Sequence, residues 1–276
     1  MPPVLVVVGD VMTDIVGRLH GRLVAGGDTP ADLVVRPGGS AANLAVAAAA
    51  AGVEAHLFAC VGDDLAGKAA AAALRTAGVR THLGRGKRPT GSVVALVHED
   101  GSRTMVSDRG ANRELSLPAE MAADHLHVSG YVLVDAATRD VGLAALARAR
   151  AAGMSTSVDA SPGVGEWLPE ASWCCLNMEE ARALVAGRGL DALLERFAAV
   201  AVTLGPGGAL VAERGRPWTQ RAAVPARVVD TTGAGDAFAG TWVGRRLAGD
   251  AAEAAVDAAL AAAARVVGVV GAGWAQ

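Results

Sequence analysis

The sequence predicts one α/β domain over residues 1–276, built on a mainly parallel sheet with two small β-rich insertions. Short apolar runs alternate with Ala-rich segments of helical length, which is typical of successive β-α-β units. The first apolar run, 4–8, is continuous and rich in Val, as in a strand covered on both faces. The segments 14–36 and 84–110 are instead Gly-rich, polar or alternating in period two. We expect these two insertions to form a lid over the core.

In the first half of the chain, the strand at 4–8 precedes a helix with Ser40 as its N-cap and Gly52 as its stop. A second strand and a second helix continue the alternation at 55–61 and 66–77. The pattern then changes to period two, with Asp100-Gly101 as a hairpin signal. We therefore expect an antiparallel insertion whose strands are 79–83, 92–98 and 103–107.

The second half of the chain returns to alternating strand and helix patterns. A hairpin-like stretch at 209–220 interrupts this order before two final Ala-rich helices. The expected strands are 125–129, 155–159 and 199–204. The expected helices are 138–152, 179–186, 234–248 and 251–266.

The composition excludes several functional classes. Hydrophobic residues make up 52% of the chain, which is enough for a large core, and the net charge of −3 provides no basic field for nucleic acid or anionic membrane. No apolar run reaches the ~18 residues that cross a bilayer, and the start of the chain has no basic leader. The three cysteines are odd in number and form no CxxC pair. We expect a soluble cytoplasmic protein.

The strongest chemical signal is the segment Asp230-Thr231-Thr232-Gly233-Ala234-Gly235-Asp236, which precedes an apolar helix. Small residues at a helix start let several backbone N–H groups converge on an anion such as phosphate. A carboxylate in that first turn can serve as a general base toward a hydroxyl group. The motif alone leaves open that Asp236 is an ordinary helix-start residue. Neither GxGxxG nor GxxxxGK[ST] occurs in the chain, so phosphate binding needs another loop.

A second signal is the segment Gly38-Gly39-Ser40-Ala41-Ala42-Asn43. Two glycines before a helix let the backbone approach a ligand closely, and an Asn amide both donates and accepts hydrogen bonds. A tight strand-to-helix turn explains the same residues.

Two further segments follow apolar runs. Asn177 and Glu180 share one face of a helix start, where their oxygens suit a hydrated Mg²⁺ ion, although an N-cap explains them equally well. The segment Thr203-Leu204-Gly205-Pro206-Gly207-Gly208 is a turn against which a nucleotide could lie.

Taken together and in this order, the motifs resemble the ribokinase-like, or PfkB, family of carbohydrate kinases. The resemblance covers essentially the whole chain and is most specific at 38–43 and 230–236. It implies a three-layer α/β/α core with a mainly parallel sheet and a small β-sheet lid over a sugar. It also implies ATP-dependent phosphorylation of a primary hydroxyl of a small sugar or sugar derivative.

The same resemblance assigns roles to single residues. Asp236 matches the catalytic base, and Gly233, Ala234 and Gly235 match the anion hole. The sugar site is implied to comprise Asp14, Gly38, Gly39, Asn43 and Asp236. The nucleotide site is implied to comprise Thr203, Gly205, Gly208, Gly233 and Gly235. Asn177 and Glu180 match the Mg²⁺ element, partly through water, and Asp230 with 271–273 matches a potassium loop. Asp159, which ends a strand, is expected to face the pocket.

Departures from the family pattern leave the substrate open. The lysine of Gly-Gly-Lys-Gly-Ala-Asn is absent at 38–43, so ribose is not assured, and 160–166 lacks the Arg that holds a keto-acid. No aromatic ring lies in the two lid segments, which places a nucleoside second. A non-catalytic sugar or nucleotide sensor is the other alternative, and Asp236 favours the enzyme.

Two expectations concern assembly and histidines. A lid sheet has open edges that need cover, so we expect a homodimer. We expect no nucleic-acid or membrane partner. His125 and His127 share a strand face, but they lack a third ligand for a metal.

Overall fold

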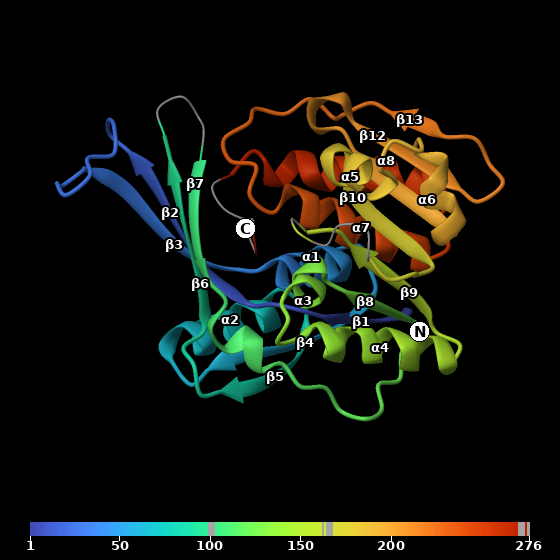
Figure 1. Cartoon of the computed structure of the whole chain (residues 1–276), viewed down its shortest axis with the longest axis horizontal. Coiled ribbons are helices and arrows are strands. Elements are labelled where there is room, and N and C mark those ends of the chain that lie inside the picture. The colour runs from blue at the N-terminus through green and yellow to red at the C-terminus, as the bar shows by residue number, and fades with distance from the viewer. Residues whose placement is uncertain (99–102, 162, 164–167, 270–273, 275–276) are drawn as a thin grey trace.

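The computed structural model describes residues 1–98, 103–161, 163, 168–269 and 274. The chain folds into a large twisted sheet with helices on both faces, and a smaller sheet projects from one side (Figure 1). This confirms the expected three-layer core with a separate small sheet. Within the described ranges, no helix combines the length and the apolar character that crossing a membrane requires.

The large sheet has the strand order β13-β12-β11-β10-β9-β8-β1-β4-β5. Its parallel strands are β1 (Val4–Val8), β4 (Glu54–Gly62), β5 (Arg80–Gly86), β8 (His125–Val128), β9 (Ser155–Asp159), β10 (Trp173–Asn177) and β11 (Ala199–Thr203). The antiparallel strands β12 (Ala209–Glu213) and β13 (Thr219–Arg221) close one edge. β1 lies between β4 and β8, as its continuous Val run predicts.

Two predictions about these strands were wrong or incomplete. The stretch 79–83 was expected in the antiparallel insertion, but β5 pairs in parallel with β4 at the edge of the large sheet. Exposed and half-buried residues nearly alternate along β5, so its period-two pattern does not say which sheet it joins. The apolar run that becomes β10 was not assigned to a strand, although it pairs with both β9 and β11.

Helices cover the two faces of the large sheet with small side chains. One face carries α1 (Ser40–Ala50), α2 (Leu65–Thr76), α7 (Ala234–Leu247) and α8 (Ala252–Val266). The other face carries α4 (Arg139–Ala151), α5 (Met178–Val185) and α6 (Asp191–Arg196). The short α3 (Gly130–Val134) and α6 were not predicted, because a helix of one or two turns leaves little periodicity to detect.

The small sheet has the order β3-β2-β6-β7. Its strands are β2 (Met12–Leu19), β3 (Ala31–Gly38), β6 (Gly91–Val97) and β7 (Arg103–Asp108). It therefore joins the two predicted insertions, which come from distant parts of the chain. The joining pair, β2 and β6, is parallel, whereas the neighbouring pairs are antiparallel. The expected turn at Asp100-Gly101 lies outside the described residues.

Two helices approach each other closely and bring distant motifs together. A Cβ atom added at Gly240 of α7 would lie 2.2 Å from the backbone oxygen of Leu44 in α1, so only glycine fits there. This contact lets α1 and α7 pack backbone to backbone. The first turns of both helices consequently meet at the same edge of the large sheet, above the carboxyl ends of its strands (Figure 1).

Candidate active site

The carboxyl ends of the parallel strands place several of the predicted site residues around one cavity. Asp159 ends β9, Asn177 ends β10 and Thr203 ends β11. These three residues line a cavity of about 190 Å³ together with Ser40, Glu180, Gly235 and Asp236. Ligands of open α/β sheets bind at this edge of the sheet. The segments 38–43 and 230–236, which the sequence singled out separately, therefore contribute to one site.

Asp236 lies in the first turn of α7 and is held by two side chains of α1. Its Oδ1 accepts a hydrogen bond from the Ser40 hydroxyl at 2.8 Å, and its Oδ2 accepts one from Asn43 Nδ2 at 2.8 Å. Burial raises the pKa of Asp236 to about 7 against the lowering effect of these two hydrogen bonds, and the nearby Asp159 and Asp10 raise it further. Such a carboxylate can accept a proton near neutral pH.

The helix start beside Asp236 has the features of an anion site. Gly233 is the N-cap of α7 with a left-handed φ of 76°, and no side chain from the described residues caps the helix. In the described part of the chain, the N–H groups of Gly235 and Asp236 have no backbone acceptor. Gly235 is exposed, and a Cβ atom added there would meet none of the described residues within 4 Å. Unpaired N–H groups and the helix dipole both attract negative charge at this point.

The N-terminus of α1 corrects one prediction. Ser40 is not the N-cap, because Gly39 occupies that position with a φ of 106°. The cap is supplied by Asp10, whose Oδ1 accepts from the Ala41 N–H at 3.1 Å and whose Oδ2 accepts from the Ser40 N–H at 3.4 Å. A carboxylate close in space replaces the hydroxyl that is close in sequence. The Ser40 side chain is therefore available to Asp236.

Asp14 of β2 lies on the inner side of the small sheet, next to the turn that precedes α1. It is 6% exposed, and a Cβ atom added at Gly38 would lie 2.2 Å from its Oδ2. Glycine is thus required for this carboxylate to reach the turn. Burial raises the pKa of Asp14 to about 6, with further contributions from Asp10 and Asp230.

Asn177 and Glu180 form a reciprocal cap at the start of α5. Asn177 Oδ1 accepts from the Glu180 N–H at 2.8 Å, and Glu180 Oε2 accepts from the Asn177 N–H at 2.8 Å. The simple N-cap explanation therefore holds, and both residues also line the cavity. Burial raises the pKa of the Glu180 carboxyl, and the Asp159 charge adds to this effect. A metal-binding role for the pair stays a prediction.

The remaining predicted residues do not complete a site in the described part of the chain. Thr203 lines it, and Gly205 and Gly208 follow in the turn between β11 and β12. Asp230 is 7% exposed, and its Oδ1 accepts hydrogen bonds from the Thr232 N–H and hydroxyl at 2.9 and 2.8 Å. The residues 271–273 of the proposed potassium loop lie outside the described part of the chain.

This combination of fold and site matches a known family. A model described as pfkB family carbohydrate kinase matches residues 3–275. The protein belongs to this family. It is 31% identical to a ribokinase of Mus musculus over 257 residues, which cover 86% of this chain and 79% of the relative.

Solved structures of other kinases support the assignment of this chain to the pfkB family. The adenosine kinase of Sinorhizobium meliloti has a TM-score of 0.84 and 25% identity, covering 98% of this chain and 95% of its own. A ribokinase of Cryptococcus neoformans in complex with ADP has a TM-score of 0.80 and 28% identity, covering 99% and 96%. The ribokinase-like fold is thereby confirmed, and the chain is a sugar or nucleoside kinase of the pfkB family.

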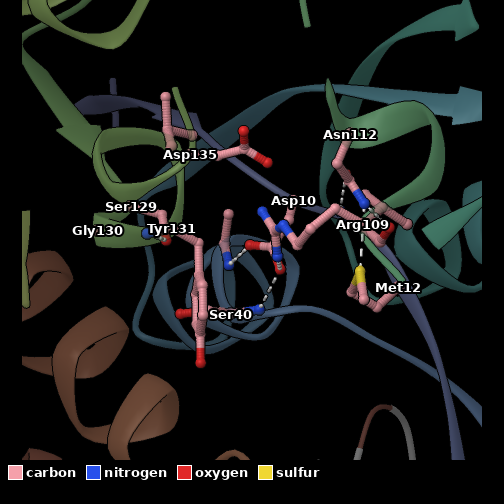
Figure 2. A network of polar contacts seen from close by, with 12 residues as sticks. Asp10, Met12, Ser40, Arg109, Asn112, Ser129, Gly130, Tyr131 and Asp135 are labelled. Atoms are coloured by element: carbon pink, nitrogen blue, oxygen red, sulfur yellow. Dashed lines mark hydrogen bonds and ion pairs between the residues drawn. The ribbon is translucent and has the colours of Figure 1, made fainter. Parts of the chain in front are cut away.

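The structure of this pfkB kinase adds residues that sequence reasoning missed (Figure 2). Arg109, which follows β7, donates from Nη1 to Asp10 Oδ2 at 3.2 Å, and its guanidinium lies 5.0 Å from the centre of the Tyr131 ring. Asn112 ties the same region to the residue before β2, because it bonds both the N–H and the carbonyl of Val11. Asp10 follows a predicted strand directly, which was a usable signal. Arg109 and Tyr131 had none.

The histidine pair of the pfkB kinase is a buried core element held by serine hydroxyls, although His127 Nε2 has no hydrogen-bond partner among the described residues. Ser157 Oγ lies 2.7 Å from His125 Nε2 and 2.9 Å from His127 Nδ1, and Ser155 Oγ lies 2.7 Å from His125 Nδ1. Burial lowers the pKa of His125 to about 3, so its ring is neutral. The parallel register of β8 and β9 aligns these side chains in one row.

Proposed function

We propose that this pfkB kinase transfers the γ-phosphoryl group of ATP to a primary hydroxyl of a small, uncharged sugar or sugar derivative. The observation that carries the proposal is the position of Asp236, which Ser40 and Asn43 hold beside the open N–H groups of α7. A base and an anion site lie next to each other in one cavity. Phosphoryl transfer to an alcohol needs both.

The proposed reaction moves one proton and one phosphoryl group. The acceptor hydroxyl gives its proton to an Asp236 carboxylate oxygen while its own oxygen bonds to the γ-phosphorus. The bond between the γ-phosphorus and the β,γ-bridging oxygen breaks, and ADP leaves. The N–H groups at the start of α7 stabilise the negative charge on the phosphoryl oxygens. Thr203, Gly205 and Gly208 would hold the nucleotide on the far side of the cavity.

Mg²⁺ fits the residues present. Asn177 and Glu180 offer hard oxygen atoms on the cavity wall. Their reciprocal cap uses one oxygen of the Glu180 carboxylate, so the other is left for a hydrated ion. When bound, Mg²⁺ neutralises charge on the phosphates. We assign Asp230 to a monovalent cation such as K⁺, which its buried carboxylate suits.

The charges around the site favour an uncharged acceptor. Asp10 and Asp159 lie near Asp236, Asp14 lies near Asp10, and Arg109 is paired with Asp10. A sugar phosphate or an acidic sugar would be repelled by these carboxylates. Asp14, Gly38, Gly39 and Asn43 would surround the acceptor, and the small sheet would cover it as a lid.

A nucleoside is the second candidate acceptor. Tyr131 lines the same cavity as Asp236, and its ring is 36% exposed. An exposed aromatic face can stack on a purine or pyrimidine base. The relative from Sinorhizobium meliloti, an adenosine kinase, supports this second choice.

We further propose a cytoplasmic homodimer. One face of the small sheet exposes Leu33, Val35 and Val106 at 65%, 64% and 64%. Contiguous apolar surface of this kind marks an association site. The three cysteines are buried and free, as in a reducing compartment.

The decisive experiment is a screen of ATP consumption with pentoses, hexoses, keto-acids and nucleosides, followed by phosphorus NMR to locate the new phosphate. We expect turnover with a neutral sugar and product phosphorylated at its primary carbon. Asp236→Asn is the control for contaminating kinases. Turnover with keto-acids alone, or with no acceptor, would overturn the proposal.

A further inference from the structure

A tryptophan near the end of the chain reaches the proposed base through one intermediate side chain. Trp274 Nε1 donates to Asn43 Oδ1 at 2.6 Å, although the two residues are 231 positions apart. Asn43 Nδ2 in turn donates to Asp236 Oδ2 at 2.8 Å. Trp274 is partly buried and packs against the hydrophobic core under α1, α7 and α8. The indole, the amide and the carboxylate therefore form a continuous chain.

The chemistry of the two end groups determines how the amide lies. An indole N–H only donates, and an ionised carboxylate only accepts. The opposite orientation of the Asn43 amide would place its oxygen against Asp236 and its NH₂ group against the indole N–H. Both contacts would then be repulsive. Asn43 is 7% exposed, so water has little room to compensate for a lost partner.

The second partner of Asp236 is less selective. The Ser40 hydroxyl lies 2.8 Å from Asp236 Oδ1, and it also lies 3.4 Å from Asp159 Oδ2. A hydroxyl has one proton, and it can rotate to either carboxylate. Asn43 is thus the contact that holds Asp236 in one orientation. The charged and titratable groups that face Asp236 from other elements are Asp10, Tyr131 and Asp159.

We propose that Trp274 is a positioning residue: its indole N–H fixes the Asn43 amide, and Asn43 thereby holds Asp236 in place for proton transfer. The inference rests on the proposed function in taking Asp236 as the base. It assigns no contact between Trp274 and the substrate.

The chain offers a matched control at Trp242. This residue is 0% exposed and belongs to the same core cluster. Its indole N–H has no hydrogen-bond partner among the described residues. Trp242→Phe and Trp274→Phe therefore remove the same atoms, and only the second removes a hydrogen bond to Asn43.

The kinetic test uses the acceptor that gives the highest turnover in the screen. We expect Trp274→Phe to lower kcat about tenfold, as loss of one well-placed hydrogen bond would, with KM for ATP changed less than about twofold. Trp242→Phe should keep the wild-type kcat. In an Asn43→Ala background, Trp274→Phe should have no further effect. Equal losses in both Phe variants, or an undiminished effect in that background, would overturn the proposal.

A spectroscopic test needs no acceptor. The carboxyl carbon of Asp236 is titrated by NMR in wild type and in both Phe variants. Loss of a fixed donor should raise the Asp236 pKa in Trp274→Phe and leave it unchanged in Trp242→Phe. Trp274→His, which keeps a ring N–H, should restore part of the difference and serves if the Phe variant unfolds. An unchanged titration in Trp274→Phe would contradict positioning, whereas a failed acceptor screen alone would contradict only the proposed activity.

Discussion

The Ser40 hydroxyl donates a hydrogen bond of 2.8 Å to Asp236 across 196 residues of sequence. Both residues lie in the first turn of a helix, and the two helices meet because Gly240 lets α7 approach α1. The proposed base is therefore held by the helix that follows the turn at Gly38 and Gly39, which is part of the proposed sugar site. Binding of a ligand against that turn would directly affect the orientation of Asp236.

Asp236→Asn tests the base. Asn has nearly the same size and retains hydrogen-bonding groups, but it cannot accept a proton at neutral pH. General-base catalysis contributes about 10²–10⁴-fold, so kcat should fall by at least this order. KM for both substrates should change by less than about threefold, because Asp14 and the α7 N–H groups are untouched. Steady-state kinetics that show kcat within about threefold of wild type would assign the proton to another group.

The pH dependence of the reaction should follow the same carboxyl. Burial raises the pKa of Asp236 to about 7, and only the ionised form can accept a proton. We expect kcat/KM to rise about tenfold per pH unit below about pH 7 and to level off above it. Buffers of matched ionic strength and stopped-time assays give the profile. In Asp236→Asn the residual rate should lose this rise.

The contribution of Asp236 to the free energy of unfolding should fall as the pH rises, whereas the reaction rate rises. The folded-state pKa of Asp236 lies above its ordinary value, so its contribution to stability is fully present at low pH and is lost as the pH rises through about 7. Asp236→Asn should therefore unfold about 2–4 °C above wild type at about pH 8, with a smaller difference at about pH 5. Calorimetry at the two pH values measures this. A larger gain at the lower pH would contradict the assigned shift.

Glu180→Gln separates the cap of α5 from a role in metal binding. Gln keeps an oxygen that can accept from the Asn177 N–H, so the melting temperature should change by less than about 2 °C. Loss of the charge should raise the Mg²⁺ concentration that gives half-maximal activity by about threefold or more. Glu179→Gln is the matched control, because Glu179 lies in the same turn but is exposed. Equal Mg²⁺ requirements in the two variants would limit Glu180 to the cap.

Ser157→Ala should destabilise the fold without touching the cavity. Ser157 Oγ contacts ring nitrogens of both His125 and His127, and the serine is 1% exposed. Its removal leaves two buried polar atoms without that partner, which costs about 1–3 kcal/mol each. Ser155→Ala removes one ring contact, to His125, and an exposed hydrogen bond to the Asp124 carbonyl, and it should cost less. Urea unfolding curves that rank the two variants in the reverse order would contradict this interpretation.

The homodimer prediction is tested on the exposed face of the small sheet. Val35→Lys places a charge among Leu33 and Val106, which together form the apolar patch. We expect light scattering to report a dimer for wild type and a monomer for this variant. Leu65→Lys changes an 84% exposed residue on α2 and should remain dimeric. A wild-type monomer at working concentration would exclude the dimer.

Local patterns in the sequence were sufficient for much of the fold. The Val run at 4–8 is a central strand, and the Gly-Ala-Gly turn at 233–235 starts α7, because both depend on residues adjacent in the chain. The same locality explains the errors. β5 was assigned to the wrong sheet, and Ser40 was wrongly assigned as the N-cap of α1. The strand that pairs with β5 and the carboxylate that caps α1 are both distant in sequence.

The sequence by itself determined the fold class and the family, and it nominated the residues proposed for phosphoryl transfer, since these reside in periodicity and in contiguous motifs. Only the tertiary structure decided which groups hold Asp236. Ser40 and Asn43 reach it through the close contact of α1 and α7, Asp10 caps α1 from the end of β1, and Trp274 reaches Asn43 from the far end of the chain. Hydrogen bonds depend on distance in space, and packing sets that distance independently of separation along the chain.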